Sequence, residues 1–231
     1  MITLLIVAAT PAEAAFLSSP NRRQPRTGVI YHINNSGRLK VDVLITGPGI
    51  VATTYHLTKV LAENRYDLAL NIGICGSLNP EYNPVHVVRI NADQFGDFGA
   101  EDGNNWLDIF ELGLIRKNDP PFKNGKLVET YKKRHTCLQA LPVSEAITVQ
   151  RSNGSTSSCQ KAFKKYGPVM ESMEGAAFFY VCRQQKVPCL QIRAISNKVT
   201  RRKLSEWKIG EAIDALAGII GLFLLELEGK A

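Results

Sequence analysis

The feature of this sequence that most constrains its fold is a series of short apolar runs separated by longer, helix-length segments. The runs are nearly continuous in apolar character and cover 2–9, 39–45, 68–74, 86–92, 146–150 and 189–196. Segments of helical length cover 50–64, 175–185 and 208–226. Strands that are buried on both faces have this pattern, so we predict an α/β fold with a twisted, mostly parallel or mixed central sheet flanked by helices.

The size of the chain fits one domain of this kind. Its 231 residues are 45% hydrophobic and 21% charged, which supplies a full core and is not typical of a disordered chain. No repeat or linker divides it, so we predict a single domain over residues 1–231. The stretch 97–126 is rich in Gly, Asn, Asp and Pro, and we expect a long functional loop with one short helix there.

Charge and cysteine content argue against several classes of protein. The formal net charge is +7, but the basic residues form no stripe interleaved with aromatic residues, so we expect no nucleic-acid partner. The five cysteines have no CxxC spacing, which argues against a disulfide framework or zinc site and predicts a reducing, cytoplasmic location. The apolar segment 215–227 is too short to span a bilayer, so we expect no membrane association.

Polar and glycine-rich residues follow the carboxyl ends of the predicted strands, where open α/β sheets bind ligands. Glu13 follows the first strand, Gly47-Pro48-Gly49 the second and the turn 73–77 the third, while 97–102, 151–154 and 196–197 follow the others. Glycine turns allow a sugar or phosphate to approach backbone N–H groups, although they also occur as ordinary tight turns. They match neither a P-loop nor a dinucleotide-binding motif.

Three side chains in these regions carry candidate chemistry. Glu174 precedes the predicted helix 175–185, where its carboxylate could bind two ribose hydroxyls or only interact with the helix dipole. Arg193 is a charge within a buried strand and requires a partner, for which a structural ion pair is sufficient. Trp207 could stack on a planar base or anchor a helix in the core. The histidines form no triad-like or metal-like pattern, so we expect neither a metal nor another cofactor.

These residues resemble the purine nucleoside phosphorylase and nucleosidase superfamily. The resemblance rests on Met173-Glu174-Gly175-Ala176-Ala177, on Ile192-Arg193-Ala194-Ile195-Ser196-Asn197, on Glu13 and on the turn 71–78. Two segments are similar to futalosine hydrolases: 92–103, with the pattern D-x-G-A-E-D-G, and 196–199 followed by 207–212. The chain departs from that pattern after Val199, where Thr200-Arg201 replaces the common Gly-Pro.

The resemblance implies hydrolysis of the N-glycosidic bond of futalosine, an inosine-like nucleoside of menaquinone biosynthesis, with release of hypoxanthine. It makes Glu13 the base that activates water, and it assigns the ribose hydroxyls to Glu174 and the purine to Asn197. The other implied substrate contacts are Met173, Ile74, Gly76, Arg193, Phe98, Trp207, Arg201 and Arg202. Arg201 and Arg202 are candidates for the substrate carboxylate, because a bidentate arginine suits that group.

Several alternatives remain open at this stage. Methylthioadenosine/S-adenosylhomocysteine nucleosidases resemble the chain but carry an aspartate where it has Asn197. A phosphorylase needs arginines at the glycine turns, and the segments 47–54 and 73–80 contain none. A non-catalytic nucleoside-binding protein would use Glu13 and Glu174 only as hydrogen-bond partners. The resemblance also implies a homo-oligomer, a dimer or larger.

Overall fold

The computed structural model describes residues 1–17, 26–35, 37–103 and 105–230. The strands are β1 (Ile2–Ala8), β2 (Ile30–Asn35), β3 (Leu39–Ile45), β4 (Leu68–Ser77), β5 (Val87–Phe95), β6 (Gly99–Asp102), β7 (Asn105–Asp108), β8 (Leu127–Val128), β9 (Val143–Thr148), β10 (Met170–Ser172) and β11 (Cys189–Lys198). The helices are α1 (Ile50–Glu63), α2 (Thr136–Gln139), α3 (Thr156–Tyr166), α4 (Gly175–Gln184) and α5 (Ile209–Glu228), with 3-10 turns η1 (Ala12–Leu17) and η2 (Leu204–Glu206). This arrangement confirms the predicted α/β class with a mixed central sheet.

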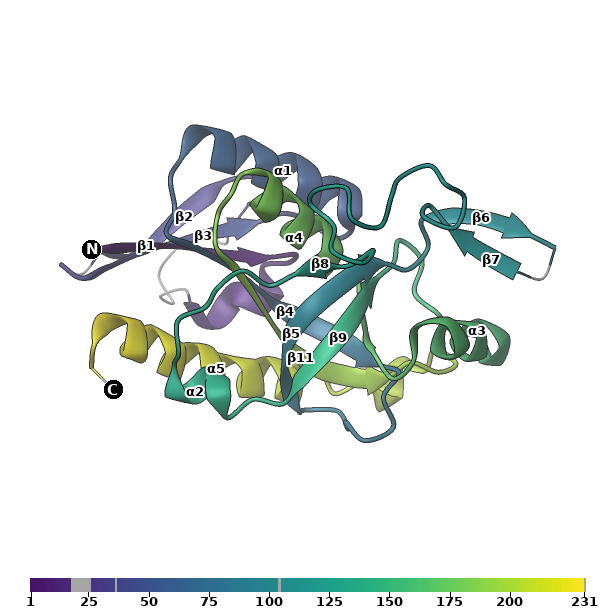
Figure 1. Ribbon diagram of the computed structural model, residues 1–231. Coiled ribbons are helices and arrows are strands. Elements are labelled where there is room, and N and C mark those ends of the chain that lie inside the picture. Colours follow the sequence, from purple (N-terminus) through teal and green to yellow (C-terminus); the bar gives the residue numbers. More distant parts are fainter. Residues whose placement is uncertain (18–25, 36, 104, 231) are drawn as a thin grey trace.

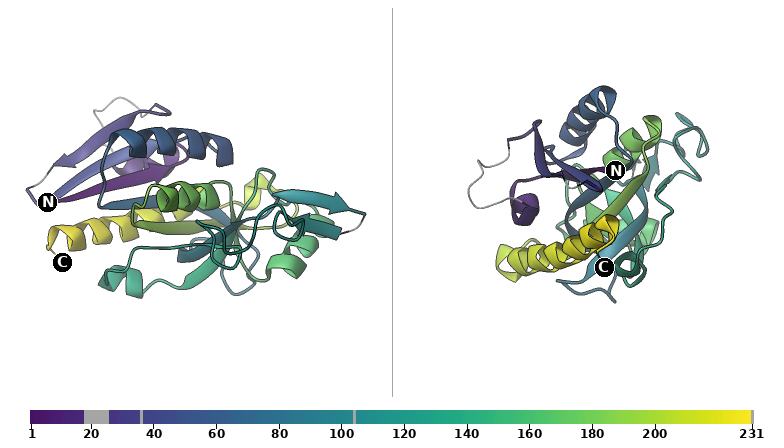
Figure 2. Two further views of the ribbon diagram at one scale, coloured as in Figure 1. Left: turned by 45° about the horizontal axis from the view of Figure 1, so that its top comes forward. Right: turned by 90° about the vertical axis from the view of Figure 1, so that its left-hand side faces the viewer.

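Helices cover both faces of the central sheet, with α1 and α4 on one side and α5 on the other (Figures 1 and 2). Strand β11 shows how the sequence produces these layers. Leu190, Ile192 and Ala194 join the hydrophobic cluster that includes the buried face of α5. Because side chains alternate along a strand, Gln191 and Arg193 face the opposite layer, where α4 lies. A polar stripe is therefore enclosed between the sheet and α4.

The central sheet has nine strands in the order β10-β9-β5-β11-β4-β1-β3-β2, with β8 paired to β5. Strands β1, β3, β4 and β11 are parallel, whereas β5 and β9 run antiparallel to β11. The short β10 pairs with both β9 and β4, so β4, β11, β5, β9 and β10 form a closed ring of hydrogen-bonded strands.

The loops at the strand ends were expected to meet because all the strands would end at the same edge of an open sheet. The ring shows that this reason is wrong. Strands β5 and β9 do not share the direction of the others, so parallel order cannot bring their carboxyl ends to the same edge. Ring closure brings these ends together instead. Gln150, just after β9, accepts a hydrogen bond at Oε1 from the Ile50 N–H of α1 at 3.0 Å. Asp97, after β5, accepts one from the Gln150 N–H at 2.7 Å.

The segment 97–126 differs from its prediction. It contains the hairpin β6–β7, of which β6 is exposed and β7 partly buried, and a series of turns, and no helix is present in its described part. Half of the residues in these two strands are polar, and they do not alternate with the apolar ones, so the hairpin lacks the hydrophobic alternation that identifies a strand. Among the helices that the structure describes, none is long and apolar enough to cross a membrane.

Candidate active site

Glu13 lies in η1, directly after the central strand β1, and is buried. Its Oε2 accepts hydrogen bonds from Thr10 N at 2.9 Å and Thr10 Oγ1 at 3.0 Å. Its Oε1 accepts a hydrogen bond from Ile74 N at 3.0 Å. The carboxylate is therefore fixed against the backbone of β4 and cannot rotate freely.

Glu174 is the residue that precedes α4 and is also buried. Its Oε1 accepts a hydrogen bond from Gly49 N at 3.1 Å, which links α4 to the glycine turn after β3. Its Oε2 lies 3.6 Å from Arg193 Nη1. Burial raises the pKa of Glu174, the Arg193 charge opposes that shift, and the nearby negative charge of Glu13 adds to it.

Arg193 is 1% exposed and is held from two sides. Its Nε donates to Gln191 Oε1 at 2.9 Å, and its Nη2 donates to Asn71 Oδ1. Its Nη1 is buried and has no hydrogen-bond partner among the residues that the structure describes. An unsatisfied buried donor is rare because it costs free energy, so this N–H requires a functional explanation.

Gly73 on β4 explains why these side chains can meet. A Cβ atom at this position would lie 2.5 Å from Arg193 Nη1 and 2.5 Å from Glu13 Oε1. Any side chain here would displace one of the two charged groups. The glycine is therefore required for the close approach of Glu13 and Arg193, and it is not an ordinary tight turn.

A further carboxyl, that of Asp93 on β5, lies behind Arg193 and is 1% exposed. Its Oδ1 accepts a hydrogen bond from Thr148 Oγ1 at 3.0 Å, and its Oδ2 accepts one from Gln191 Nε2 at 3.1 Å. Burial raises the pKa of Asp93 to about 7, although both hydrogen bonds and the Arg193 charge oppose this shift. Gln191 therefore connects a buried carboxyl to the guanidinium of Arg193.

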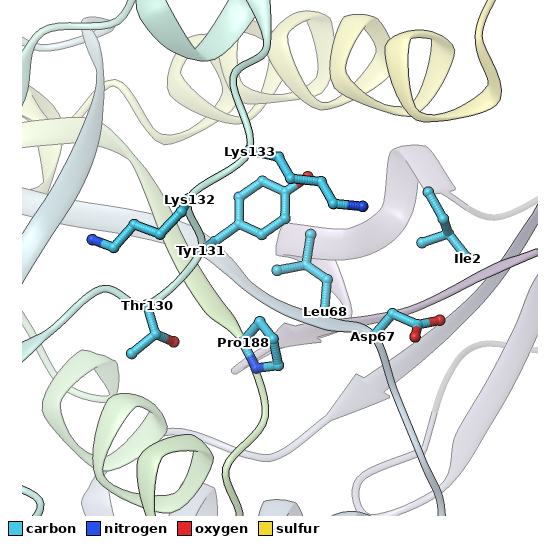
Figure 3. A pocket seen from close by; sticks show the side chains of 8 residues that line it. All are labelled: Ile2, Asp67, Leu68, Thr130, Tyr131, Lys132, Lys133 and Pro188. Atoms are coloured by element: carbon cyan, nitrogen blue, oxygen red, sulfur yellow. The ribbon is translucent and has the colours of Figure 1, made fainter.

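A hollow in the surface lies apart from this cluster. This hollow, of about 320 Å³, is lined by Ile2, Asp67, Leu68, Thr130, Tyr131, Lys132, Lys133 and Pro188 (Figure 3). It adjoins the amino ends of β1, β4 and β11. Glu13, by contrast, lies after the carboxyl end of β1, and Gly73 lies inside β4, so the hollow is separate from the cluster. Within the described ranges, no group of three or more His, Cys, Asp or Glu side chains could hold a metal ion.

Comparison with known families places the chain. Residues 3–224 match the model of the phosphorylase superfamily. The chain belongs to this superfamily. Among curated relatives, it is 27% identical to the futalosine hydrolase of Streptomyces coelicolor over 238 residues, which cover 97% of this chain and 96% of that one. It is 26% identical to the futalosine hydrolase of Thermus thermophilus, with 98% and 97% covered.

Two solved structures show the same fold. The futalosine hydrolase of Helicobacter pylori has a TM-score of 0.78 at 14% identity and covers 97% of this chain and 98% of its own. The 5′-methylthioadenosine/S-adenosylhomocysteine nucleosidase of Neisseria meningitidis has a TM-score of 0.77 at 17% identity, with 98% and 100% covered. Both likenesses confirm a nucleoside phosphorylase-like architecture.

The structure brings one group of the predicted site residues together, namely Glu13, Ile74, Glu174 and Arg193. Met173 adjoins Glu174 and is half-buried. Gly76 pairs in register with Asn197 across β4 and β11, and a Cβ at Gly76 would lie 3.4 Å from Asn197 Nδ2.

The amide of Asn197 is held locally by its chain neighbours. Its Nδ2 donates to Lys198 O at 2.8 Å, and its Oδ1 accepts from Ser196 Oγ at 2.8 Å. An amide has two N–H donors and two acceptor lone pairs, so each end keeps capacity for a ligand.

Four predicted contacts lie apart from that group. Phe98 is 51% exposed and packs edge-on against Phe95. Arg201 and Arg202 are exposed, and the guanidinium of Arg202 lies 5.0 Å from the ring centre of Trp207. In the described part of the chain, no contact links Phe98, Arg201, Arg202 or Trp207 to the cluster around Gly73. Their assignment to the substrate stays a prediction.

Several members of the buried network were assigned no role from the sequence: Thr10, Asn71, Asp93, Gln150 and Gln191. A signal was available for some of them. Asn71, Asp93 and Gln191 are polar residues inside apolar strands, as Arg193 is. A buried polar group requires a partner, so such residues on neighbouring strands are expected to bond to one another.

Proposed function

We propose that this protein hydrolyses the N-glycosidic bond of futalosine, releasing hypoxanthine and dehypoxanthine futalosine. The observation that carries this proposal is the convergence of Glu13, Glu174 and the unpartnered Nη1 of Arg193 around Gly73. The curated futalosine hydrolases that match nearly the whole chain supply the substrate.

The cluster suits a reaction that passes through a cationic sugar. In the proposed step the C1′–N9 bond breaks, its electron pair leaves with the base, and the ribosyl ring becomes oxocarbenium-like. The Glu174 carboxylate accepts hydrogen bonds from the ribose hydroxyls and stabilises the positive ring. A water molecule held between Glu13 and Arg193 Nη1 forms the new C1′–O bond and transfers its proton to Glu13.

Base recognition is assigned to Asn197 at the far end of β11. Its amide can donate to O6 or N7 of a 6-oxopurine and can accept from a developing N7–H. An amide cannot act as an acid, so the proton that the base gains comes from solvent. General acid help contributes roughly 10²–10⁴-fold where it is present. Its absence suits hypoxanthine, which tolerates negative charge better than adenine.

The remaining contacts are assigned by position. Met173, Ile74 and Gly76 would contact the sugar, and Phe98 and Trp207 would cover the base or the 5′ extension. Arg201 and Arg202 would bind the carboxylate of that extension. Because Arg202 already stacks on Trp207, a bound carboxylate would meet a partly ordered guanidinium.

A second candidate function is methylthioadenosine/S-adenosylhomocysteine nucleosidase activity. It is favoured by the overall fold that the chain shares with solved nucleosidases of that name. An amide at position 197 also pairs with N6 and N7 of adenine. Phosphorolysis is disfavoured, because the turns 47–54 and 73–80 carry no arginine to bind phosphate.

One assay separates these functions. The protein is incubated with futalosine, inosine and methylthioadenosine, each with and without phosphate, and free base is measured by chromatography. We expect hypoxanthine from futalosine, at a rate independent of phosphate. Adenine from methylthioadenosine alone would support the second candidate, and phosphate-dependent release would exclude hydrolysis. If no base is released from any nucleoside, the enzyme assignment is wrong and nucleoside binding remains.

We also propose that the enzyme is a single domain, that it is cytoplasmic and that it forms a homo-oligomer. One domain over residues 1–231 is supported by the central nine-stranded sheet, against which the C-terminal helix α5 packs. A cytoplasmic location is supported by the five free cysteines.

Association with a second copy is supported by Val51 and Tyr55, which are 71% and 63% exposed and one turn apart on α1. Light scattering of V51R/Y55R should then report 25.5 kDa, and the unaltered protein a multiple of it.

A further inference from the structure

Asp93, Gln191 and Arg193 form a continuous chain of hydrogen bonds from the centre of the sheet to the candidate active site. Asp93 Oδ2 accepts from Gln191 Nε2 at 3.1 Å, and Gln191 Oε1 accepts from Arg193 Nε at 2.9 Å. Arg193 Nη1 then reaches to 3.6 Å from Glu174. We propose that Asp93 is a positioning residue, which acts through Gln191 to hold the Arg193 guanidinium toward Glu13 and Glu174.

The direction of every hydrogen bond in this chain depends on Asp93. An amide side chain can present either its NH₂ or its oxygen to a neighbour. Asp93 accepts at Oδ2, so Gln191 must turn its NH₂ toward Asp93 and its oxygen toward the Arg193 Nε–H. The reversed amide would place two donors face to face at Arg193. The carboxyl therefore selects the one Gln191 orientation that can bind Arg193.

The other oxygen of Asp93 is committed to the start of α4. Thr148 Oγ1 accepts a hydrogen bond from Ala176 N at 2.7 Å and donates to Asp93 Oδ1 at 3.0 Å. A Cβ atom on Gly175 would overlap both Asp93 Oδ2 and the Gln191 amide. The same carboxyl thus lies directly beneath the first turn of α4, which begins immediately after Glu174.

Asp93 does not contact the other charged groups of the site directly. Its hydrogen bonds go to Thr148, Gln191 and the Gln94 backbone, and its influence on Glu13 and Glu174 passes through Arg193. It is therefore distinct from a residue that touches substrate. Its loss should displace Arg193, and a displacement of about 1 Å lowers a rate by about 10²-fold.

The test compares D93N with D42N. Asparagine has one oxygen and one NH₂, so it cannot accept from both Thr148 and Gln191 as the ionised carboxylate does. All kinetic constants are therefore measured at pH 8, above the raised pKa of Asp93. Asp42 is also a buried strand carboxyl that accepts two hydrogen bonds, from His32 Nδ1 at 2.5 Å and Tyr66 Oη at 2.9 Å, but it has no link to Arg193. We expect D93N to lower kcat for futalosine by about 10- to 100-fold with a smaller change in KM. D42N should retain both constants in its folded fraction.

A second measurement does not depend on catalysis. The buried Arg193 Nε–H should give a slowly exchanging signal in a ¹⁵N–¹H spectrum, assigned by its loss in R193K. We expect this signal to shift and exchange faster in D93N and to stay unchanged in D42N. If D93N does not fold, Q191M, which removes the link at similar volume, should give the same changes in the signal and in kcat.

The double variant D93N/Q191M tests whether the two residues act as one unit. If Asp93 acts through Gln191, the double variant should lose no more kcat than Q191M alone, whereas independent effects multiply. Independent effects, or an unchanged Arg193 signal in D93N, would overturn the positioning role. The kinetic arm rests on the proposed hydrolase function. If the unaltered protein releases no base, that function fails while the Arg193 signal still decides the role of Asp93.

Discussion

At the scale of single residues, the cluster around Gly73 has an unbalanced charge. The carboxyls of Glu13 and Glu174 face one guanidinium, that of Arg193, and all three side chains are buried. Burial and the charge of Glu13 both raise the pKa of Glu174, so two carboxylates are held together at a cost in free energy. A cationic ribosyl ring between them would relieve this repulsion, and this favours the transition state over a neutral nucleoside.

The space at Gly73 gives the first prediction. G73A places a Cβ 2.5 Å from Arg193 Nη1 and Glu13 Oε1, so one of these groups must move. We expect kcat to fall by about 10²-fold, because a 1 Å displacement has an effect of that size. The measurement is steady-state kinetics with futalosine. G218A, at an exposed α5 site with no atom near its Cβ, is the matched control and should keep its activity. Equal activity in G73A would contradict the geometry described for the site.

The raised pKa of Glu174 gives a second prediction. The proposed role requires the ionised form, so activity should fall as the pH decreases through the pKa of Glu174. Because burial raises that pKa, the acid limb of kcat should lie above about 4.3, the ordinary value for a glutamate. E174Q should lose this limb and about 10²-fold or more in kcat. E129Q, which alters a buried glutamate paired with Arg89, is the control and should keep the limb. A limb that persists in E174Q would assign it to another group.

At the same scale, the sequence could predict part of the site. Glu13, Glu174 and Arg193 were singled out because they follow a strand, precede a helix or lie inside a strand, but their proposed roles came from the resemblance to the nucleosidase superfamily. Gln191 and Asp93 were missed because each has an ordinary role when considered alone, and only pairing of strands β5 and β11 places them in contact. Asn197 was also predicted, but the orientation of its amide was not. That orientation depends on hydrogen bonds with Ser196 and Lys198, which no spacing rule could have indicated.

At the scale of elements, prediction succeeded where apolar content alone decides the structure. Strands β1 and β3 and helices α1, α4 and α5 agree with their predictions to within two residues at each end. Strand β10 has three residues, too few for periodicity, yet it closes the ring of strands. Strand β6 is exposed and β7 is only partly buried, so no alternating burial pattern marks this hairpin. Tertiary pairing, which a single sequence does not display, determines both.

Helix α3 allows a prediction at this scale. It was not predicted, and its sequence Thr156–Tyr166 is mostly polar, with Ala162 its only buried residue. Its start is defined by Ser155, whose side chain accepts a hydrogen bond from Ser158 N at 3.0 Å in a capping box. S155A should lower the free energy of unfolding by about 0.5–2 kcal/mol. Urea unfolding measures the change, with T156A as control. If the two variants lose the same stability, the cap has no specific contribution.

At the scale of the whole molecule, stability is linked to the buried carboxyls. Burial raises the pKa of Asp93 from 3.8 to about 7, and it also raises the pKa values of Glu129, Glu171 and Glu174. Between these two values, from about pH 4 to about pH 7, the folded protein retains a proton on Asp93 that the unfolded chain has released. Rising pH therefore reduces the stability of the folded protein in this range. The net charge of +7 acts in the opposite direction, because acidification adds positive charge and self-repulsion.

Comparing D93N with the unaltered protein at each pH cancels the contribution of net charge. The stabilisation that Asp93 provides is full below about pH 4 and declines as the pH rises through about 7, where the buried carboxyl ionises. D93N has no proton to lose, so the free-energy difference between the two proteins should shrink from pH 4 to pH 8. Urea unfolding across this range measures it, and S144A, a buried uncharged change on β9, should show a constant difference. A D93N difference that is constant or grows with pH would mean that the folded protein does not retain a proton at Asp93.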